Sequence, residues 1–177
     1  MNNIALENIE QPIDTSQFLT FMLSGEELAV SIMQVKEVIE YDSLTSVPMM
    51  PNFISGALNL RGSIVPVVNL AIKFGMPVSE ITHRSCVVIM EVMLDGEESV
   101  IGILVDKVLQ VNYITDEDIH AAPTLGSQIR TDFIRGMGKL KERFVTILAI
   151  NRVLSEEEIA IAGNIQKEDE TLMEARA

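Results

Sequence analysis

The chain has 177 residues, of which 47% are hydrophobic, so it is long and apolar enough to fold around a core of its own. Its formal net charge is −13 at pH 7. This charge repels nucleic-acid phosphates and anionic lipid, which disfavours a nucleic-acid-binding or membrane-surface role. The first 16 residues contribute −3 and residues 155–177 contribute −5, so the part between them is only mildly acidic.

Cysteine content and hydropathy bear on the compartment. Cys86 is the single cysteine, which excludes an internal disulfide and suits a reducing environment. The first residues lack the basic region and apolar core of a signal peptide. No uncharged apolar run approaches the roughly 18 residues of a membrane-spanning helix. We therefore expect a soluble, intracellular protein.

The N-terminal third of the chain predicts a flexible lead-in followed by strands. Residues 1–16 are acidic, polar and interrupted by Pro12, which favours disorder. Residues 18–23 and 28–32 are apolar runs around a glycine-containing turn, which predicts a hairpin. Residues 35–41 alternate almost throughout, as a half-buried strand does.

The next segment carries three prolines. Pro48 and Pro51 exclude a helix interior, but Pro51 is compatible with the first turn of a short helix at 52–58. Residues 64–70 are apolar on both faces, which predicts a buried strand with an edge or a bulge at Pro66.

The second half predicts a similar set of elements. A long strand at 85–94 turns at 95–98 and returns along 99–104. Ser155 and Glu158 form a capping box, which predicts a C-terminal helix starting near Glu156, with its end and a tail in 158–177.

A degenerate internal repeat organises the chain. Phe53-Ile54-x-Gly56 and the following Leu60-Arg61 recur 80 positions later as Phe133-Ile134-x-Gly136 and Leu140-Lys141, and the apolar run after each copy also matches. A shorter match relates residues 23–27 to 94–98. We expect two pseudo-repeats, about 17–83 and 84–154, with exchange of strands between them possible. Several short strands per copy predict a mostly β fold of two small barrels or curled sheets.

The sequence shows no catalytic or metal-binding constellation. His83 and His120 lie in polar loops away from any nucleophile, and Cys86 adjoins apolar residues typical of an inert core position. The acidic run at 116–118 lacks the spacing of a calcium loop. We therefore expect no enzyme activity, no cofactor and no metal.

Arg61 lies at a turn beside apolar segments, and two interpretations remain open. It is either an ordinary surface arginine, or it binds a carboxylate such as Glu37 with both guanidinium nitrogens. Lys141 occupies the equivalent position in the second repeat, and a lysine cannot reproduce that fork.

Four stretches together carry a family resemblance. They are Phe21-Met22-Leu23-x-Gly25-Glu26-Glu27, Val35-Lys36-Glu37-Val38-Ile39-Glu40-Tyr41, the segment from Asn59 to Val67, and Ile101-Gly102-Ile103-Leu104-Val105-Asp106-x-Val108. Over about residues 17–157 the chain resembles the CheW-type chemotaxis coupling proteins. The resemblance implies a mostly β fold of two SH3-like five-stranded barrels in tandem with exchanged strands and a C-terminal helix.

The same resemblance implies a function. A protein of this kind is a non-catalytic adaptor that links the cytoplasmic tips of chemoreceptors to the regulatory domain of a histidine kinase. It is cytoplasmic and recruited to membrane-associated receptor arrays, and it binds no nucleic acid. The positions that match the family's binding motifs are Val35, Glu37, Val38, Asn59, Leu60, Arg61 and Gly62.

We further expect a receptor helix in an apolar groove near Val35, Val38 and the Arg61 turn, with the kinase domain at a separate end. The alternative functions are a small-ligand-binding β-barrel and an enzyme. The first requires polar groups facing an apolar cavity, and the second requires an acid, base or nucleophile with an orienting partner.

Overall fold

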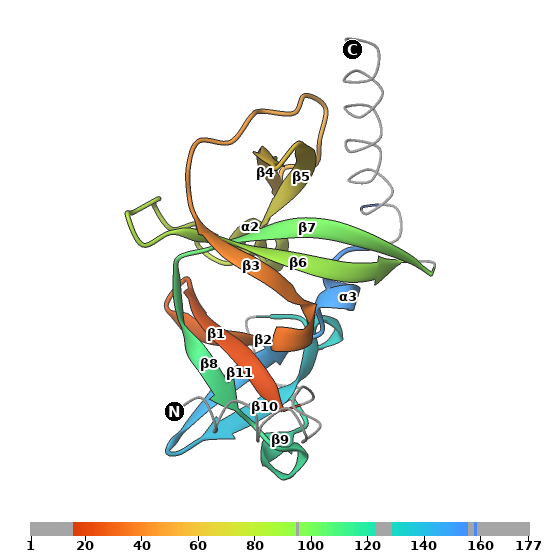
Figure 1. The fold of residues 1–177 in the computed structure, drawn as a ribbon. Helices are drawn as coiled ribbons and strands as arrows, with labels where there is room; N and C mark the ends of the chain where they lie inside the picture. The colour runs from red at the N-terminus through yellow and green to blue at the C-terminus, as the bar shows by residue number, and fades with distance from the viewer. Residues whose placement is uncertain (1–15, 95, 123–128, 156–157, 159–177) are drawn as a thin grey trace, which may run out of the picture.

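Two β-sheets make up most of the computed structural model, which describes residues 16–94, 96–122, 129–155 and 158 (Figure 1). Sheet A has the strand order β8-β1-β2-β11-β10-β9, and sheet B has the order β3-β6-β7-β5-β4. The strands of sheet A are β1 Gln17–Leu23, β2 Glu26–Ser31, β8 Lys107–Tyr113, β9 Ile119–His120, β10 Ile134–Leu140 and β11 Arg143–Leu148. Those of sheet B are β3 Val35–Glu40, β4 Ile54–Leu60, β5 Ser63–Asn69, β6 Cys86–Leu94 and β7 Glu97–Val105.

Each sheet is assembled from both halves of the sequence. Sheet A joins the hairpin β1–β2 to strands β8–β11, and sheet B joins β3–β5 to the hairpin β6–β7. Each sheet has two strand pairs that join the halves. One is parallel, β2 with β11 in sheet A and β5 with β7 in sheet B. The other is antiparallel, β1 with β8 in sheet A and β3 with β6 in sheet B. The predicted mostly β fold with exchanged strands is confirmed. Sheet A has six strands rather than five because the two-residue β9 adds an edge.

The apolar residues form one core between the sheets and a smaller core within each sheet. The alternation of β6 shows how one strand serves two cores. Val88 and Met90 point into the shared core, whereas Val87 and Ile89 point into the core of sheet B. Successive strand residues face opposite sides, so a strand that is apolar throughout must be buried on both faces. Phe18 and Val145 belong to the third core, inside sheet A.

The sequence repeat corresponds to a repeated structural unit. Strands β4 and β5 and the helix α2 (Leu70–Phe74) recur 80 positions later as β10, β11 and α3 (Ile150–Val153). The first hairpin has a register shift between Ile54 and Gly56, and the second has one between Ile134 and Gly136. The helix α2 is capped by Asn69, whose Oδ1 accepts from the Ile72 amide at 3.3 Å. It ends at Gly75, which is left-handed with φ 71°.

The predicted helix at 52–58 is wrong, because most of this segment belongs to strand β4. Pairing with β5 on one side and an isolated bridge from Thr45 to Ala57 on the other outweighed the helix-start signal of Pro51. A Cβ on Gly56 would lie 2.6 Å from the Thr45 carbonyl oxygen, so glycine permits this close approach. The predicted strand at 64–70 is confirmed, and β7 pairs with β5 only from Val67 onward, just after Pro66.

The capping box at the start of the predicted C-terminal helix is confirmed. The Ser155 amide donates to Glu158 Oε1 at 2.8 Å, and the Glu158 amide donates to Ser155 Oγ at 3.1 Å. The rest of that helix, the tail to residue 177 and the lead-in up to residue 15 lie outside the described residues. Within the described ranges no helix is long and apolar enough to cross a membrane.

Candidate functional site

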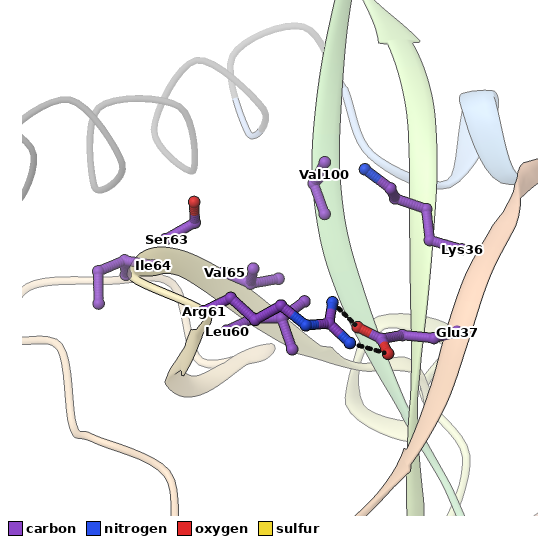
Figure 2. Close-up of a pocket in the computed structure, with 8 residues that line it drawn as sticks. All are labelled: Lys36, Glu37, Leu60, Arg61, Ser63, Ile64, Val65 and Val100. Atoms are coloured by element: carbon purple, nitrogen blue, oxygen red, sulfur yellow. Dashed lines mark hydrogen bonds and ion pairs between the residues drawn. The ribbon is translucent and has the colours of Figure 1, made fainter.

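Arg61 and Glu37 form a two-pronged ion pair (Figure 2). Arg61 Nη1 donates to Glu37 Oε1 at 2.9 Å, and Nη2 donates to Oε2 at 3.0 Å. This confirms the interpretation that Arg61 binds a carboxylate with both nitrogens. The Arg61 side chain is 76% exposed and that of Glu37 is 26% exposed, so the guanidinium remains accessible while its carboxylate partner is partly covered.

The turn that carries Arg61 is built by its neighbours. Arg61 and Gly62 have φ values of 51° and 88°, the pair of positive angles expected of a type I′ hairpin turn. Leu60 and Ser63 are the last paired residues, so Arg61 and Gly62 form the two-residue loop. Asn59 Oδ1 accepts from the Gly62 amide at 2.8 Å and fixes the turn. Asn59 and Gly62 therefore position Arg61.

A bulge in β3 positions Glu37. Val35 pairs with Met90, Glu37 with Ile89 and Val38 with Val88, with a register shift between Val35 and Glu37. Directly paired residues share a face of the sheet. Met90 and Val88 belong to the shared core and Ile89 to the core of sheet B. Val35 and Val38 therefore lie on one face of β3, and Glu37 lies on the other.

The seven predicted residues consequently form two sets. Glu37 and Arg61 come together with the turn residues Asn59, Leu60 and Gly62. Val35 and Val38 face the other side of β3, where Val38 is 39% exposed and Val35 packs against the shared core. A single groove containing Val35, Val38 and Arg61 is therefore not what the structure shows. It shows two surfaces that share one strand.

A hollow of about 540 Å³ lies beside the ion pair. Leu60, Ile64 and Val65 give it an apolar wall, and Figure 2 shows Lys36 and Glu37 entering from β3. Its charged side chains bind carboxylates or cations of the protein itself, since Lys36 Nζ lies 3.3 Å from Glu91 Oε1. A hollow of this kind offers a mixed apolar and charged surface, which suits a macromolecular partner. A small-ligand site would instead have free polar groups that converge on the ligand.

The equivalent end of sheet A has different chemistry. Lys141 repeats the positive φ of Arg61, at 54°, but no described residue forms an ion pair with it. The charge there is carried by Arg143, which donates to Glu27 from Nε at 2.9 Å and from Nη2 at 3.2 Å. The Arg143–Glu27 pair joins adjacent strands, so the two ends are not equivalent.

A second ionic centre, at Lys73, escaped sequence analysis. Lys73 Nζ lies 2.7 Å from Glu158 Oε1, 4.7 Å from the centre of the Phe53 ring and 5.9 Å from that of Phe133. Burial alone would raise the pKa of Glu158, but hydrogen bonds from Lys73 and Ser155, with the charge of Lys73, lower it. The sequence repeat could have indicated this centre, because Phe53 and Phe133 occupy equivalent positions in the two copies. In the structure the Lys73 ammonium group contacts both rings.

The remaining reactive side chains differ in part from the expectation, because His120 belongs to the short strand β9 rather than to a loop, and Cys86 is not fully buried. Cys86 is half-buried and donates from Sγ to the Arg84 carbonyl oxygen at 3.3 Å, and burial raises the pKa of its thiol. His120 is exposed and lies edge-on to Phe144, with ring centres 6.2 Å apart. Across the described ranges, no three His, Cys, Asp or Glu side chains are grouped to hold a metal ion.

Two strand-exchanged β-sheets with charged, accessible turns at their ends are the features that this structure offers for comparison with known proteins. The sequence model of the CheW-like domain matches residues 17–158, and the chain belongs to this family. It is 36% identical over 151 residues to the chemotaxis protein CheW of Klebsiella aerogenes, covering 85% of this chain and 89% of that protein. It is 32% identical over 142 residues to the Bacillus subtilis chemotaxis protein CheW, covering 80% and 88%.

A solved structure agrees with these relatives. The crystal structure of the scaffolding protein TtCheW from Thermoanaerobacter tengcongensis superposes with a TM-score of 0.73 at 29% identity. The match covers 84% of this chain and 93% of that one. The whole two-sheet unit, rather than one barrel, is therefore shared.

Proposed function

We propose that this protein is a non-catalytic chemotaxis adaptor that links the cytoplasmic tips of chemoreceptors to a chemotaxis histidine kinase. The observation that carries the proposal is the family match over residues 17–158, which spans both sheets. Relatives matched over most of their own length are named chemotaxis protein CheW, and the solved relative is named a scaffolding protein. The adaptor acts in the cytoplasm and reaches receptor arrays through its partners.

The geometry of β3 supports a protein that binds two partners. An adaptor must present two surfaces that can be occupied at once. The face with Val38 offers exposed aliphatic surface, and the opposite face offers the Arg61 turn with its charged hollow. Arginine is favoured at protein interfaces because its planar group binds carboxylates in pairs and its stem packs on apolar surface. We assign the receptor helix to the Val38 face and the kinase regulatory domain to the Arg61 end.

The competing small-ligand function has less support. The hollow beside Arg61 is large enough for a small molecule, but its guanidinium and its carboxylate already bind each other. A ligand that binds the same fork or the carboxylate of Glu37 would have to break that pair. A protein partner can instead use the exposed edge of the guanidinium and the apolar wall formed by Leu60 and Ile64 without breaking it.

Reconstitution tests the proposal. A receptor cytoplasmic fragment and the kinase from the same organism are mixed with and without this protein, and kinase autophosphorylation is measured. Wild type is expected to raise the rate only when receptor is present. Arg61→Ala is expected to lose most of that effect, and Arg84→Ala, which removes another exposed arginine, serves as the matched control. No stimulation by a folded wild-type protein would refute the adaptor function.

A further inference from the structure

A second groove lies at α3 and the 3-10 turn η2 (Ile32–Gln34), and it contains none of the seven predicted site residues. Its volume is about 390 Å³, and Gln34, Arg135, Asn151 and Arg152 contribute polar side chains to its wall. These residues come from three places in the sequence that the fold brings together. The groove has no counterpart in the repeat, because Arg135 and Arg152 correspond to Ser55 and Ile72.

The two arginines are what set the groove apart. Of the other described arginines, Arg61, Arg130 and Arg143 each bind a carboxylate. Arg84 is exposed and forms no ion pair with a described residue, but it stands alone, whereas the groove holds two such arginines. Neither Arg135 nor Arg152 forms an ion pair with any described residue, although both are exposed and the chain as a whole carries a charge of −13. The guanidinium of Arg135 lies 5.5 Å from the ring of the buried Phe18, which restricts its direction. Two guanidinium groups in one groove suit carboxylates from outside.

The rim of the groove is fixed by amides and flanked by methionines. Asn151 Oδ1 accepts from Gln34 Nε2 at 3.0 Å and from the Met93 amide at 3.3 Å, which ties α3 to η2 and to the end of β6. Met33, next to Gln34, is 59% exposed, and Met93 is 48% exposed. Methionine is flexible and polarisable, so exposed methionines provide an apolar surface that adapts to a partner.

We propose that this groove docks an acidic, amphipathic segment of a partner protein. Carboxylates of the segment bind Arg135 and Arg152, and its apolar face packs on Met33 and Met93. Charge complementarity favours this occupant. A long polyanion such as nucleic acid would be repelled by the negative charge of the whole chain, whereas a short acidic segment contacts mainly the two arginines of the groove. This docking surface is additional to the adaptor function and does not depend on it.

The test uses a synthetic helical peptide of about 18 residues, five turns, with glutamates on one face and leucines on the other. Binding of the labelled peptide to the full-length protein is measured by fluorescence anisotropy at low salt. The double variant Arg135→Gln/Arg152→Gln is expected to bind at least about tenfold more weakly. Lys139→Gln, which removes an exposed cation from the same strand as Arg135, is expected to bind like wild type.

Three outcomes would overturn the proposal. The first is no binding by the wild type, and the second is an equal loss in Lys139→Gln. The third concerns the acidic residues Glu168, Asp169 and Glu170 of this chain. If their replacement by glutamine, asparagine and glutamine raises peptide affinity about tenfold or more, the groove's occupant is the chain's own C-terminal segment rather than a partner. The result of the kinase reconstitution has no bearing on any of these outcomes.

Discussion

Arg61 and Glu37 join the two ends of one open sheet. Glu37 lies on β3 and Arg61 on the turn after β4, and these strands are the first and last in the order of sheet B. Three strands, β6, β7 and β5, separate β3 from β4 in the hydrogen-bonded order. The ion pair can therefore form only because the sheet curls until its edges approach, as in a small barrel.

Arg61→Ala is expected to change binding far more than stability. An exposed ion pair contributes about 0–1 kcal/mol, so the free energy of unfolding should fall by no more than about 1 kcal/mol. Loss of a guanidinium at an interface should weaken partner binding by at least about tenfold, or roughly 1.4 kcal/mol. Urea denaturation and binding titrations measure the two quantities. The variant Arg61→Lys keeps the positive charge but removes the two-pronged geometry, so it separates these two contributions. A loss of stability above about 2 kcal/mol in Arg61→Ala would show that the ion pair supports the fold.

Gly56→Ala is expected to destabilise the protein by about 2 kcal/mol or more. The added Cβ would lie 2.6 Å from the Thr45 carbonyl oxygen, and Gly56 has φ 151°, a conformation that side chains disfavour. Thermal and chemical denaturation give the magnitude. Ser55→Ala, at the exposed preceding residue, should change stability by less than about 0.5 kcal/mol. Equal stability of the two variants would contradict the close approach of Thr45.

Val38→Asp is expected to weaken one partner and spare the other. Val38 is 39% exposed and faces away from Glu37, so a charge there should leave the fold intact while disrupting an apolar contact. Receptor binding should fall about tenfold, and kinase binding should stay within about twofold. Separate binary titrations with each partner measure this. Equal weakening of both in a folded variant would mean that the two partners share one surface.

Glu158→Gln is expected to reduce the pH dependence of stability. The pKa of Glu158 in the folded protein is lowered, so the carboxylate stabilises the fold above its unfolded pKa, and this contribution is lost as the pH falls through the folded pKa. Wild type should therefore lose more stability than Glu158→Gln between neutral pH and about pH 3. Lys73→Met should show the same reduced slope. If the stability of wild type and of Glu158→Gln changed equally with pH, the contact between Lys73 and Glu158 would not contribute to the stability of the fold.

Much of the fold follows from two features of the sequence. The repeat predicted equivalent hairpins, and the apolar runs without polar faces predicted strands buried on both sides, as β5 and β6 are. The prediction of a helix at 52–58 is wrong because it rests on the local signal at Pro51, whereas the long-range pairing of β4 decides the structure of this segment. The second copy could have corrected it, since Gly136 and Gly138 in its equivalent segment are poor helix residues.

The ion pair between Arg61 and Glu37 could be anticipated from the sequence, but the arrangement of the candidate site residues could not. Motif positions singled out Glu37 and Arg61, and a fork between them was one of the two interpretations of Arg61 that the sequence left open. The division between Val38 and Glu37 depends on the bulge in β3, and no local pattern at residues 35–38 marks it. The Lys73 centre and the arginine groove depend on contacts between residues more than 80 positions apart, which a linear pattern does not contain.

The exchange of strands sets an order of assembly during synthesis. Sheet B uses strands from β3 to β7, so all of it exists once Val105 has left the ribosome. The hairpin β1–β2 is made first, but its parallel neighbour β11 begins only at Arg143, and until then the free side of β2 is an open edge. Such edges recruit foreign strands. The hairpin that is made first is therefore the last to gain its parallel neighbour, and the edge of β2 stays unpaired until Arg143 and the residues after it have been synthesised.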